Sequence, residues 1–172
     1  MPSILRSFLP SILLAIAALG AAAVATAQSL PAGVQLGMSP AELQAALPEA
    51  QRVARPQRLA GGLAGTWRGA PVAMAGLRFE PTFYFAGAHL RRVEWTTGAD
   101  VTPDQCAAAF DALLAWGRGR FGSELASRDP GSRYAAWVAD DTDVYAQLVE
   151  AERGPSVRLV YKTRQLRDAS EL

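Results

Sequence analysis

The sequence is poor in the residues that most often carry chemistry, since its 172 residues include one cysteine, Cys106, and one histidine, His89. A single cysteine can form neither an internal disulfide nor a C-x-x-C redox pair, so the fold must be stabilised by its core alone. His89 has no second histidine and no nearby cysteine, and so lacks the partners needed for a zinc site or for a Cys-His or Ser-His arrangement. The sequence therefore predicts no metal or redox centre built on these two residues.

Two widespread site motifs are also missing, namely the G-x-S-x-G turn of serine hydrolases and the glycine loop that binds phosphate. The charges are balanced, with 17 lysines and arginines against 16 acids, and this excludes a strongly basic chain of the kind that binds nucleic acid. We therefore assign no catalytic, cofactor-binding or metal-binding residue, and expect no cofactor and no nucleic-acid partner.

The first 27 residues have the three-part layout of a secretory signal peptide. Arg6 supplies the positive charge, residues 12–19 are apolar, and the small residues Ala25 and Ala27 satisfy the A-x-A cleavage rule. We expect cleavage between Ala27 and Gln28. The mature protein is then periplasmic or secreted.

The alternative to cleavage is a membrane anchor. Pro10 and Gly20 interrupt the apolar run, and no cation follows it until Arg52, so the positive flank of a stop-transfer segment is missing. Lipidation would require a cysteine at the cleavage point, and Cys106 is far from it. We expect no stable membrane anchor once the signal peptide is removed.

The rest of the chain, 28–172, has 145 residues, which suits one domain. We place this single domain at 28–165 and a polar C-terminal tail at 166–172. Removing residues 1–27 takes away one cation, Arg6, so that the remaining chain carries 16 cations and 16 acids and is formally neutral.

Two helices are predicted, at 39–47 and 102–120. Each begins with a capping box headed by proline: Ser39 and Thr102 are the N-caps, and Glu42 and Gln105 stand three residues later. The apolar face of the second helix is expected to pack on an aromatic hairpin that contains Phe83, Phe85 and Trp95. This face is formed by Cys106, Phe110, Leu113, Leu114, Gly117 and Phe121.

Strands are predicted where β-branched and aromatic residues alternate with polar ones. Residues 86–89 should form a four-residue hairpin connection, 49–62 a strand fragment followed by a loop, and 129–131 part of a polar loop. The predicted strands are 66–68, 72–79, 82–85, 90–96, 134–139, 144–150 and 157–162.

These elements predict an α+β fold in which antiparallel β-meanders pack against the two helices within a single domain. Helix and strands follow one another twice, in units of similar length. Whether the two units arose by duplication stays open, because they share a pattern of elements and not clear residue identity.

The stretch from Gly33 to Leu43, with the sequence GVQLGMSPAEL, resembles the first helix of small bacterial envelope domains that carry a GM[ST]xx[ED] signature. These domains include the lipoprotein of the β-barrel assembly machinery and the β-lactamase inhibitor protein. The resemblance implies a helix-plus-meander domain that binds other proteins. The chain differs from the first by lacking a lipidated cysteine and from the second by lacking paired cysteines.

Residues 50–99 are unusually basic, with only Glu80 and Glu94 to balance seven arginines, at 52, 55, 58, 68, 78, 91 and 92. Two interpretations remain open. The arginines could be the solvated faces of strands, or they could form a patch that binds anions through bidentate contacts.

Other candidate residues have ordinary structural explanations. His89 lies at a predicted hairpin tip, and the acidic cluster Asp140, Asp141 and Asp143 lacks the spacing of a calcium-binding loop. Cys106 is expected to be buried and inert. Of the four tryptophans, 67, 95 and 137 should fill the core, and Trp116 should be partly exposed.

The sequence thus favours a non-catalytic envelope module that binds another envelope protein through a strand edge or exposed aromatic residues. The alternative is a periplasmic hydrolase that uses carboxylates such as Asp140 and Glu150. A cleft with two facing carboxylates would indicate the hydrolase, and a flat apolar edge would indicate the binding module. The sequence identifies neither the partner nor the oligomeric state.

Overall fold

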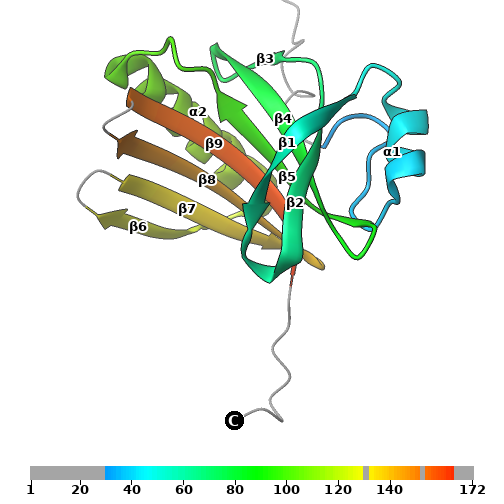
Figure 1. Cartoon of the computed structure of the whole chain (residues 1–172). Coiled ribbons are helices and arrows are strands. Elements are labelled where there is room, and N and C mark those ends of the chain that lie inside the picture. Colours follow the sequence, from blue (N-terminus) through cyan, green and yellow to red (C-terminus); the bar gives the residue numbers. More distant parts are fainter. Residues whose placement is uncertain (1–29, 130–131, 152–153, 165–172) are drawn as a thin grey trace, which may run out of the picture.

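The computed structural model describes residues 30–129, 132–151 and 154–164. The predicted signal peptide and C-terminal tail lie outside these ranges. The described residues form one antiparallel sheet and two α-helices (Figure 1). Their bounds are α1 Pro40–Ala46, β1 Gln51–Leu59, the 3-10 turn η1 Ala60–Gly62, β2 Leu63–Arg68, β3 Val72–Met74, β4 Leu77–Ala86, β5 His89–Thr97, α2 Pro103–Phe121, β6 Leu125–Asp129, β7 Ser132–Ala139, β8 Thr142–Ala151 and β9 Gly154–Thr163.

The sheet consists of two meanders that meet at its centre. The strand order is β1-β2-β4-β5-β9-β8-β7-β6, and the short β3 pairs with β4 beside this path. β5 and β9 form the junction, from Arg92 opposite Lys162 to Thr96 opposite Arg158. The two free edges of the path are therefore β1 and β6, which belong to different meanders.

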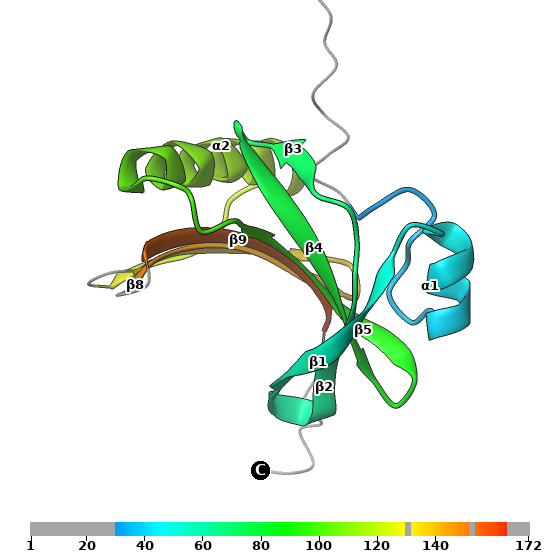
Figure 2. The same ribbon diagram turned by 45° about the horizontal axis from the view of Figure 1, so that its top comes forward.

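The predicted α+β class is wrong, because the fold is predominantly β. Over the described ranges, nine strands stand against two helices, and the strands form a single sheet instead of separate meanders that each pack on a helix. α1 has only seven residues, and Leu43 is its one buried residue. It lies beside the β1 and β2 end of the sheet in Figure 2, so α2 is the only helix in the described ranges that covers a sheet face.

Both helices begin with the capping boxes that the sequence predicts. Ser39 Oγ accepts a hydrogen bond from the Glu42 backbone N–H at 3.3 Å, and the Glu42 carboxylate accepts one from the Ser39 backbone N–H at 2.7 Å. Thr102 and Gln105 form the same reciprocal pair at the start of α2. The boxes satisfy backbone donors that the first helical turn leaves without partners. Neither helix in the described ranges is long and apolar enough to cross a membrane.

α2 lies across β7, β8 and β9, and not across the aromatic hairpin that contains Phe83, Phe85 and Trp95. The expectation about its packing partner is therefore corrected. Its buried residues are Cys106, Ala109, Phe110, Leu113 and Gly117, which match the predicted apolar face except that Ala109 joins it and Leu114 and Phe121 are only partly buried. The helix thus covers the C-terminal meander.

Several strand predictions also need correction. Residues 51–59 form the full strand β1, although a strand fragment followed by a loop is predicted for much of this segment. Residues 125–129 form β6, although its end is predicted to be a loop. β4 runs without interruption through Pro81. The hairpin between β4 and β5 turns on two residues, Gly87 and Ala88, which both have positive φ, and Ala86 is paired with His89.

Candidate functional site

One face of the sheet turns away from α2, and no described helix covers it (Figures 1 and 2). We call this the open face. Successive side chains of a strand point to opposite faces of the sheet. In the middle of β8 and β9 every second residue is buried and faces α2, and the residues between these positions point to the open face. The strand register aligns them in rows across the sheet. One row holds Thr82, Glu94, Val160, Tyr145 and Ala136, and its neighbour holds Tyr84, Arg92, Lys162, Asp143 and Val138.

The centre of the open face is a network of charges around Glu94, whose side chain is only 10% exposed. Arg92 donates to Glu94 Oε2 from Nε at 3.1 Å and from Nη2 at 2.6 Å. Arg158 Nη1 donates to Glu94 Oε1 at 3.4 Å, and the Thr96 hydroxyl lies 3.5 Å from the same oxygen. The buried carboxylate is therefore balanced by two guanidinium groups, as a charge at this depth requires.

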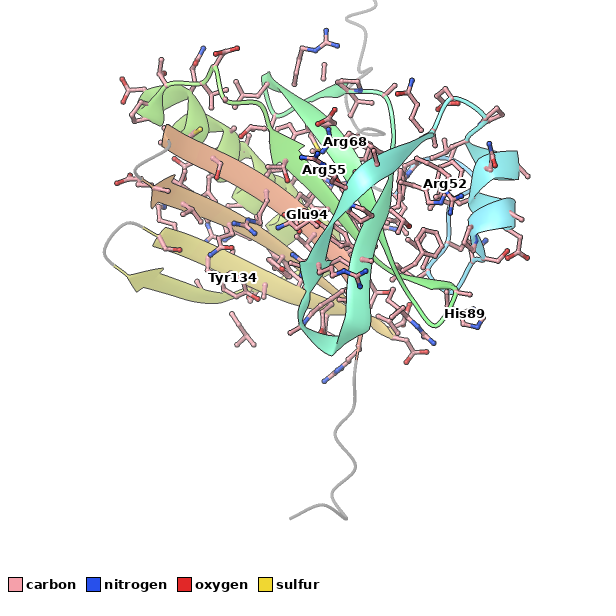
Figure 3. All side chains as sticks on the ribbon, viewed as in Figure 1. Arg52, Arg55, Arg68, His89, Glu94 and Tyr134 are labelled. Atoms are coloured by element: carbon pink, nitrogen blue, oxygen red, sulfur yellow. The ribbon has the colours of Figure 1, made fainter. Side chains whose placement is uncertain are left out.

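Aromatic rings hold Arg92 in place. Its guanidinium carbon lies 5.8 Å from the centre of the Tyr84 ring and 5.6 Å from that of Tyr145, within the range of cation–π attraction. The Tyr145 ring in turn packs at a tilt against the Tyr134 ring, with ring centres 5.3 Å apart. Burial raises the pKa of both these tyrosines. Glu94 and Tyr134 mark the two ends of this arrangement in Figure 3.

The network has a clear structural role, because it covers an apolar residue that no helix shields. Val160 points to the open face between Glu94 and Tyr145, yet it is fully buried. Arg92 reaches across this position from β5 to stack on Tyr145 of β8. The charged and aromatic side chains thus form a second layer over the middle of the sheet.

Tyr84 is covered from the other side by the β1–β2 hairpin. Its hydroxyl donates to Gln57 Oε1 at 2.9 Å, and its ring lies so close to Gly65 that a Cβ there would meet it. Tyr84 is 2% exposed as a result. The open face is therefore closed at its β1–β2 end and accessible towards β6.

An apolar hollow of about 410 Å³ lies at the accessible end. Leu125 and Val138 are 76% and 49% exposed, and no other large hydrophobic side chain in the described ranges is as exposed. Leu125 pairs with Ala136, so both side chains share the open face with Tyr134. Residues from β8, β9 and the end of α2 complete the hollow, which is lined by Phe121, Ser123, Leu125, Tyr134, Ala136, Trp137, Val138, Asp143 and Lys162.

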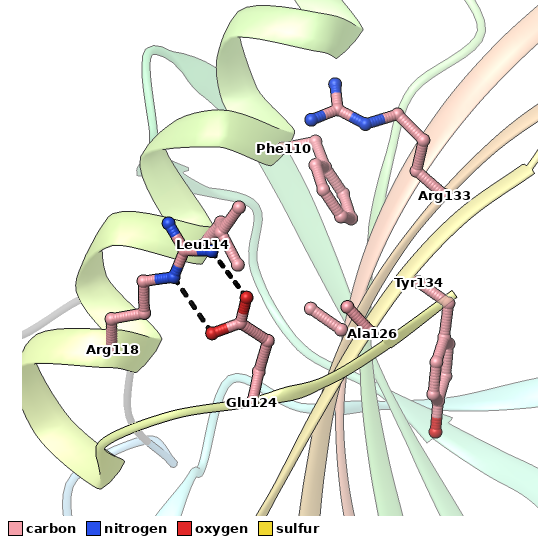
Figure 4. A pocket seen from close by; sticks show the side chains of 8 residues that line it. Phe110, Leu114, Arg118, Glu124, Ala126, Arg133 and Tyr134 are labelled. Atoms are coloured by element: carbon pink, nitrogen blue, oxygen red, sulfur yellow. Dashed lines mark hydrogen bonds and ion pairs between the residues drawn. The ribbon is translucent and has the colours of Figure 1, made fainter. Parts of the chain in front are cut away.

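A second cleft, of about 300 Å³, lies on the helix side between α2 and β6–β7 (Figure 4). Arg118 donates to both carboxylate oxygens of Glu124, at 2.8 and 2.5 Å, and this contact lowers the pKa of Glu124 to about 2. Arg133 forms an ion pair with Asp111, and its guanidinium carbon lies 4.4 Å from the centre of the Phe110 ring. Each cation in the cleft already has a carboxylate partner, so the cleft offers no free charge to a ligand.

The candidate catalytic and metal-binding residues are not brought together. His89 is exposed at the hairpin, where its Nδ1 lies 3.0 Å from the Gly37 carbonyl oxygen (Figure 3). Asp140 precedes β8 and Glu150 lies near its far end, some eight strand positions beyond Thr142, so these carboxylates cannot face each other across a cleft. Asp143 pairs with Lys162 at 3.4 Å. Among described residues, no group of three or more His, Cys, Asp or Glu could hold a metal ion.

The arginines of residues 50–99 divide into paired and unpaired groups. Arg92 binds Glu94, and Arg68 Nε lies 3.6 Å from Glu80. The others, at 52, 55, 58, 78 and 91, form no ion pair with any described residue. Three of these unpaired arginines lie on the edge strand β1.

Cys106 and the tryptophans lie where the sequence predicts. Cys106 is fully buried, and burial raises the pKa of its thiol. Trp67, Trp95 and Trp137 belong to the core, while Trp116 is partly buried and packs edge-on against Phe121.

Sequence reasoning missed the residues that make the open face distinctive. Leu125 stands alone in a polar stretch that has no strand-like alternation, so nothing marked it as an edge residue. Glu94 did carry a signal, since it is a charged residue between the apolar residues Val93 and Trp95 of a strand. Comparison of the chain with protein-family models, curated proteins and solved structures finds no match.

Proposed function

We propose that this protein is a non-catalytic module of the bacterial envelope that binds another protein through the β6 end of its open face. The observation that carries the proposal is that Leu125 and Val138 are both exposed and line one hollow on that face. Exposed apolar groups that adjoin one another at a hollow mark interaction surfaces more often than isolated ones do.

The surroundings of the hollow suit a polypeptide partner. β6 pairs only with β7 among the described strands, so the outer edge of its backbone is available to an added strand. Tyr134 extends the apolar surface, and Lys162 and Asp143 provide a polar rim. Apolar anchors, an aromatic residue and a polar rim are the usual components of a protein interface.

A photo-crosslinking amino acid at position 125 tests the surface directly. In cells that produce the protein, we expect one discrete crosslinked species from position 125. None should form from Ala112, which is exposed on the outer side of α2. Introducing Val138→Lys into the position-125 protein should abolish the species with little change in the thermal midpoint, because Val138 is half exposed and lies opposite Asp143. Equal crosslinking from both positions, or an adduct that Val138→Lys does not change, would rule out this surface.

Export is tested separately. Protein recovered from the periplasm or the medium should have an intact mass that begins at Gln28, and it should remain in solution without detergent. A mass that includes residues 1–27 would contradict the proposed location but would leave the binding surface untouched.

A further inference from the structure

The strand β1 forms the free edge of the sheet opposite β6, and it carries a row of arginines. Arg52, Arg55 and Arg58 are all exposed, while Val53, Pro56 and Leu59 are the half-buried positions between them. Burial thus repeats every three residues along β1, which leaves each arginine in solvent. At about 3.3 Å per residue, neighbouring arginines stand about 10 Å apart along the strand.

These three arginines are not paired with any described carboxylate. The sequence from 50 to 79 contains no acid at all. Arg52 is held against the Trp67 ring, with its guanidinium carbon 5.6 Å from the ring centre. Figure 3 shows Arg52 on the α1 side of β1 and Arg55 on the other side, so both faces of the edge are basic.

The backbone of β1 is also available. Its ladder with β2 is broken between Arg52 and Gln57, and no described residue outside β2 makes a backbone hydrogen bond with β1. An edge with free N–H and C=O groups is a template for another extended chain. Phosphate groups and lipid headgroups would satisfy the arginines, but they cannot pair with both kinds of backbone group.

We propose that β1 binds an acidic, extended segment of another polypeptide, which adds to the sheet as a further strand. Carboxylates on both faces of the added strand would meet the arginines, and its backbone would pair with the edge of β1. The proposal is independent of the one for β6, because the two strands lie at opposite edges of the sheet. Either surface can fail while the other stands.

A synthetic peptide of Glu-Glu-Val repeats with the nine-residue length of β1 is the probe, and fluorescence anisotropy measures its binding to the purified protein. We expect saturable binding that weakens about tenfold when salt is raised from about 0.05 to 0.5 M. A Lys-Lys-Val peptide should not bind. No saturable binding of the acidic peptide at low salt would overturn the proposal.

Matched variants distinguish binding at the edge strand β1 from attraction by the net charge of the protein. The triple substitution Arg52→Gln, Arg55→Gln and Arg58→Gln should weaken binding about tenfold or more. The control Arg78→Gln, Arg91→Gln and Arg120→Gln removes the same charge from exposed positions elsewhere and should change binding by less than about twofold. Equal losses in the two variants would mean that net charge alone attracts the peptide. Circular dichroism checks that both variants fold.

Two further experiments test whether the peptide binds as an added strand. Methylating alternate backbone nitrogens of the peptide should weaken binding about fivefold or more, because it removes the donors to β1. Unchanged affinity would contradict strand addition. Vesicles of anionic lipid and inorganic polyphosphate should bind more weakly than the peptide. If either bound more tightly and required the same three arginines, a polypeptide partner would be ruled out.

Discussion

The ring of Trp137 occupies the space that a side chain on Gly117 would need. A Cβ built on Gly117 would lie much closer than van der Waals contact to three atoms of the indole ring. The ring is fixed from its other side, since Trp137 Nε1 donates to the Gly122 carbonyl oxygen at 3.1 Å. α2 can therefore approach β7 closely only because position 117 has no side chain.

Substituting Gly117→Ala should destabilise the protein by about 1–3 kcal/mol, because the new methyl group must push Trp137 or the helix away. The gain of about 1 kcal/mol in helix propensity opposes this loss but does not exceed it. Gly119→Ala is the matched control, since open space surrounds Gly119 on the same helix. Urea midpoints should fall for position 117 and hold or rise for position 119. A rise at both positions would contradict the close contact.

The face of α2 that packs on the sheet is tested by Phe110, which is 2% exposed. Phe110→Ala should cost about 3–5 kcal/mol, since it leaves a cavity over β7 and removes the ring under Arg133. Asp111→Ala breaks a half-exposed ion pair with Arg133 and should cost less than about 1 kcal/mol. Chemical denaturation of both variants checks the contrast. If the two unfold alike, the helix does not bury this face.

The Cys106 thiol should resist alkylation in the native protein. It is fully buried, and burial raises its pKa, so the reactive thiolate is both scarce and inaccessible. At mildly alkaline pH, we expect native labelling to be at least about tenfold slower than labelling in denaturant. Mass spectrometry over time measures both rates. Rapid native labelling would show that α2 does not shield this residue.

The features of the fold that could be predicted from the sequence are those that depend on residues close together in the chain. The capping boxes at Ser39 and Thr102 depend only on residues three positions apart, and both helices begin where they indicate. The burial of Cys106 followed from helical spacing. In each case the determining interactions are close in the chain, so no knowledge of tertiary structure was needed.

The edge strands could not be predicted, because tertiary pairing overrides their composition. β1 contains three arginines and Pro56, and its burial repeats every three residues instead of every two. β4 continues through Pro81, which lies between the predicted strands 72–79 and 82–85. The Gly69 N–H donates to the Pro81 carbonyl oxygen, so the missing proline N–H points to the gap between β2 and β3 and costs β4 no bond to β5.

The open-face network could not be predicted either. Glu94 meets Arg158 and Arg92 meets Tyr145 only after β9 pairs with β5 and β8 pairs with β9, and these strands are about sixty residues away from β5 in the sequence. The sequence placed seven arginines in one region but could not separate Arg92, which is buried against Glu94, from the exposed arginines of β1.

Tyr84 gives the protein a stability that should fall at alkaline pH. Burial, with a smaller contribution from the charge of Glu94, raises the pKa of Tyr84 to about 12, from about 10 in an unfolded chain. The unfolded state therefore loses this proton first as the pH rises. The contribution of Tyr84 is fully present below about pH 10 and is lost as the pH approaches about 12.

The variant Tyr84→Phe isolates this effect from the other tyrosines, whose pKa values are raised in the same direction. At about pH 8 it should be less stable than the parent by about 0.5–1.5 kcal/mol, because the hydrogen bond to Gln57 is lost. Above about pH 10 the parent loses stability that the variant cannot lose, so the difference between them should shrink. Urea midpoints of both proteins at about pH 8, 10 and 11.5 measure this difference. A difference that stays constant with pH would mean that the Tyr84 hydroxyl is not buried beneath the β1–β2 hairpin.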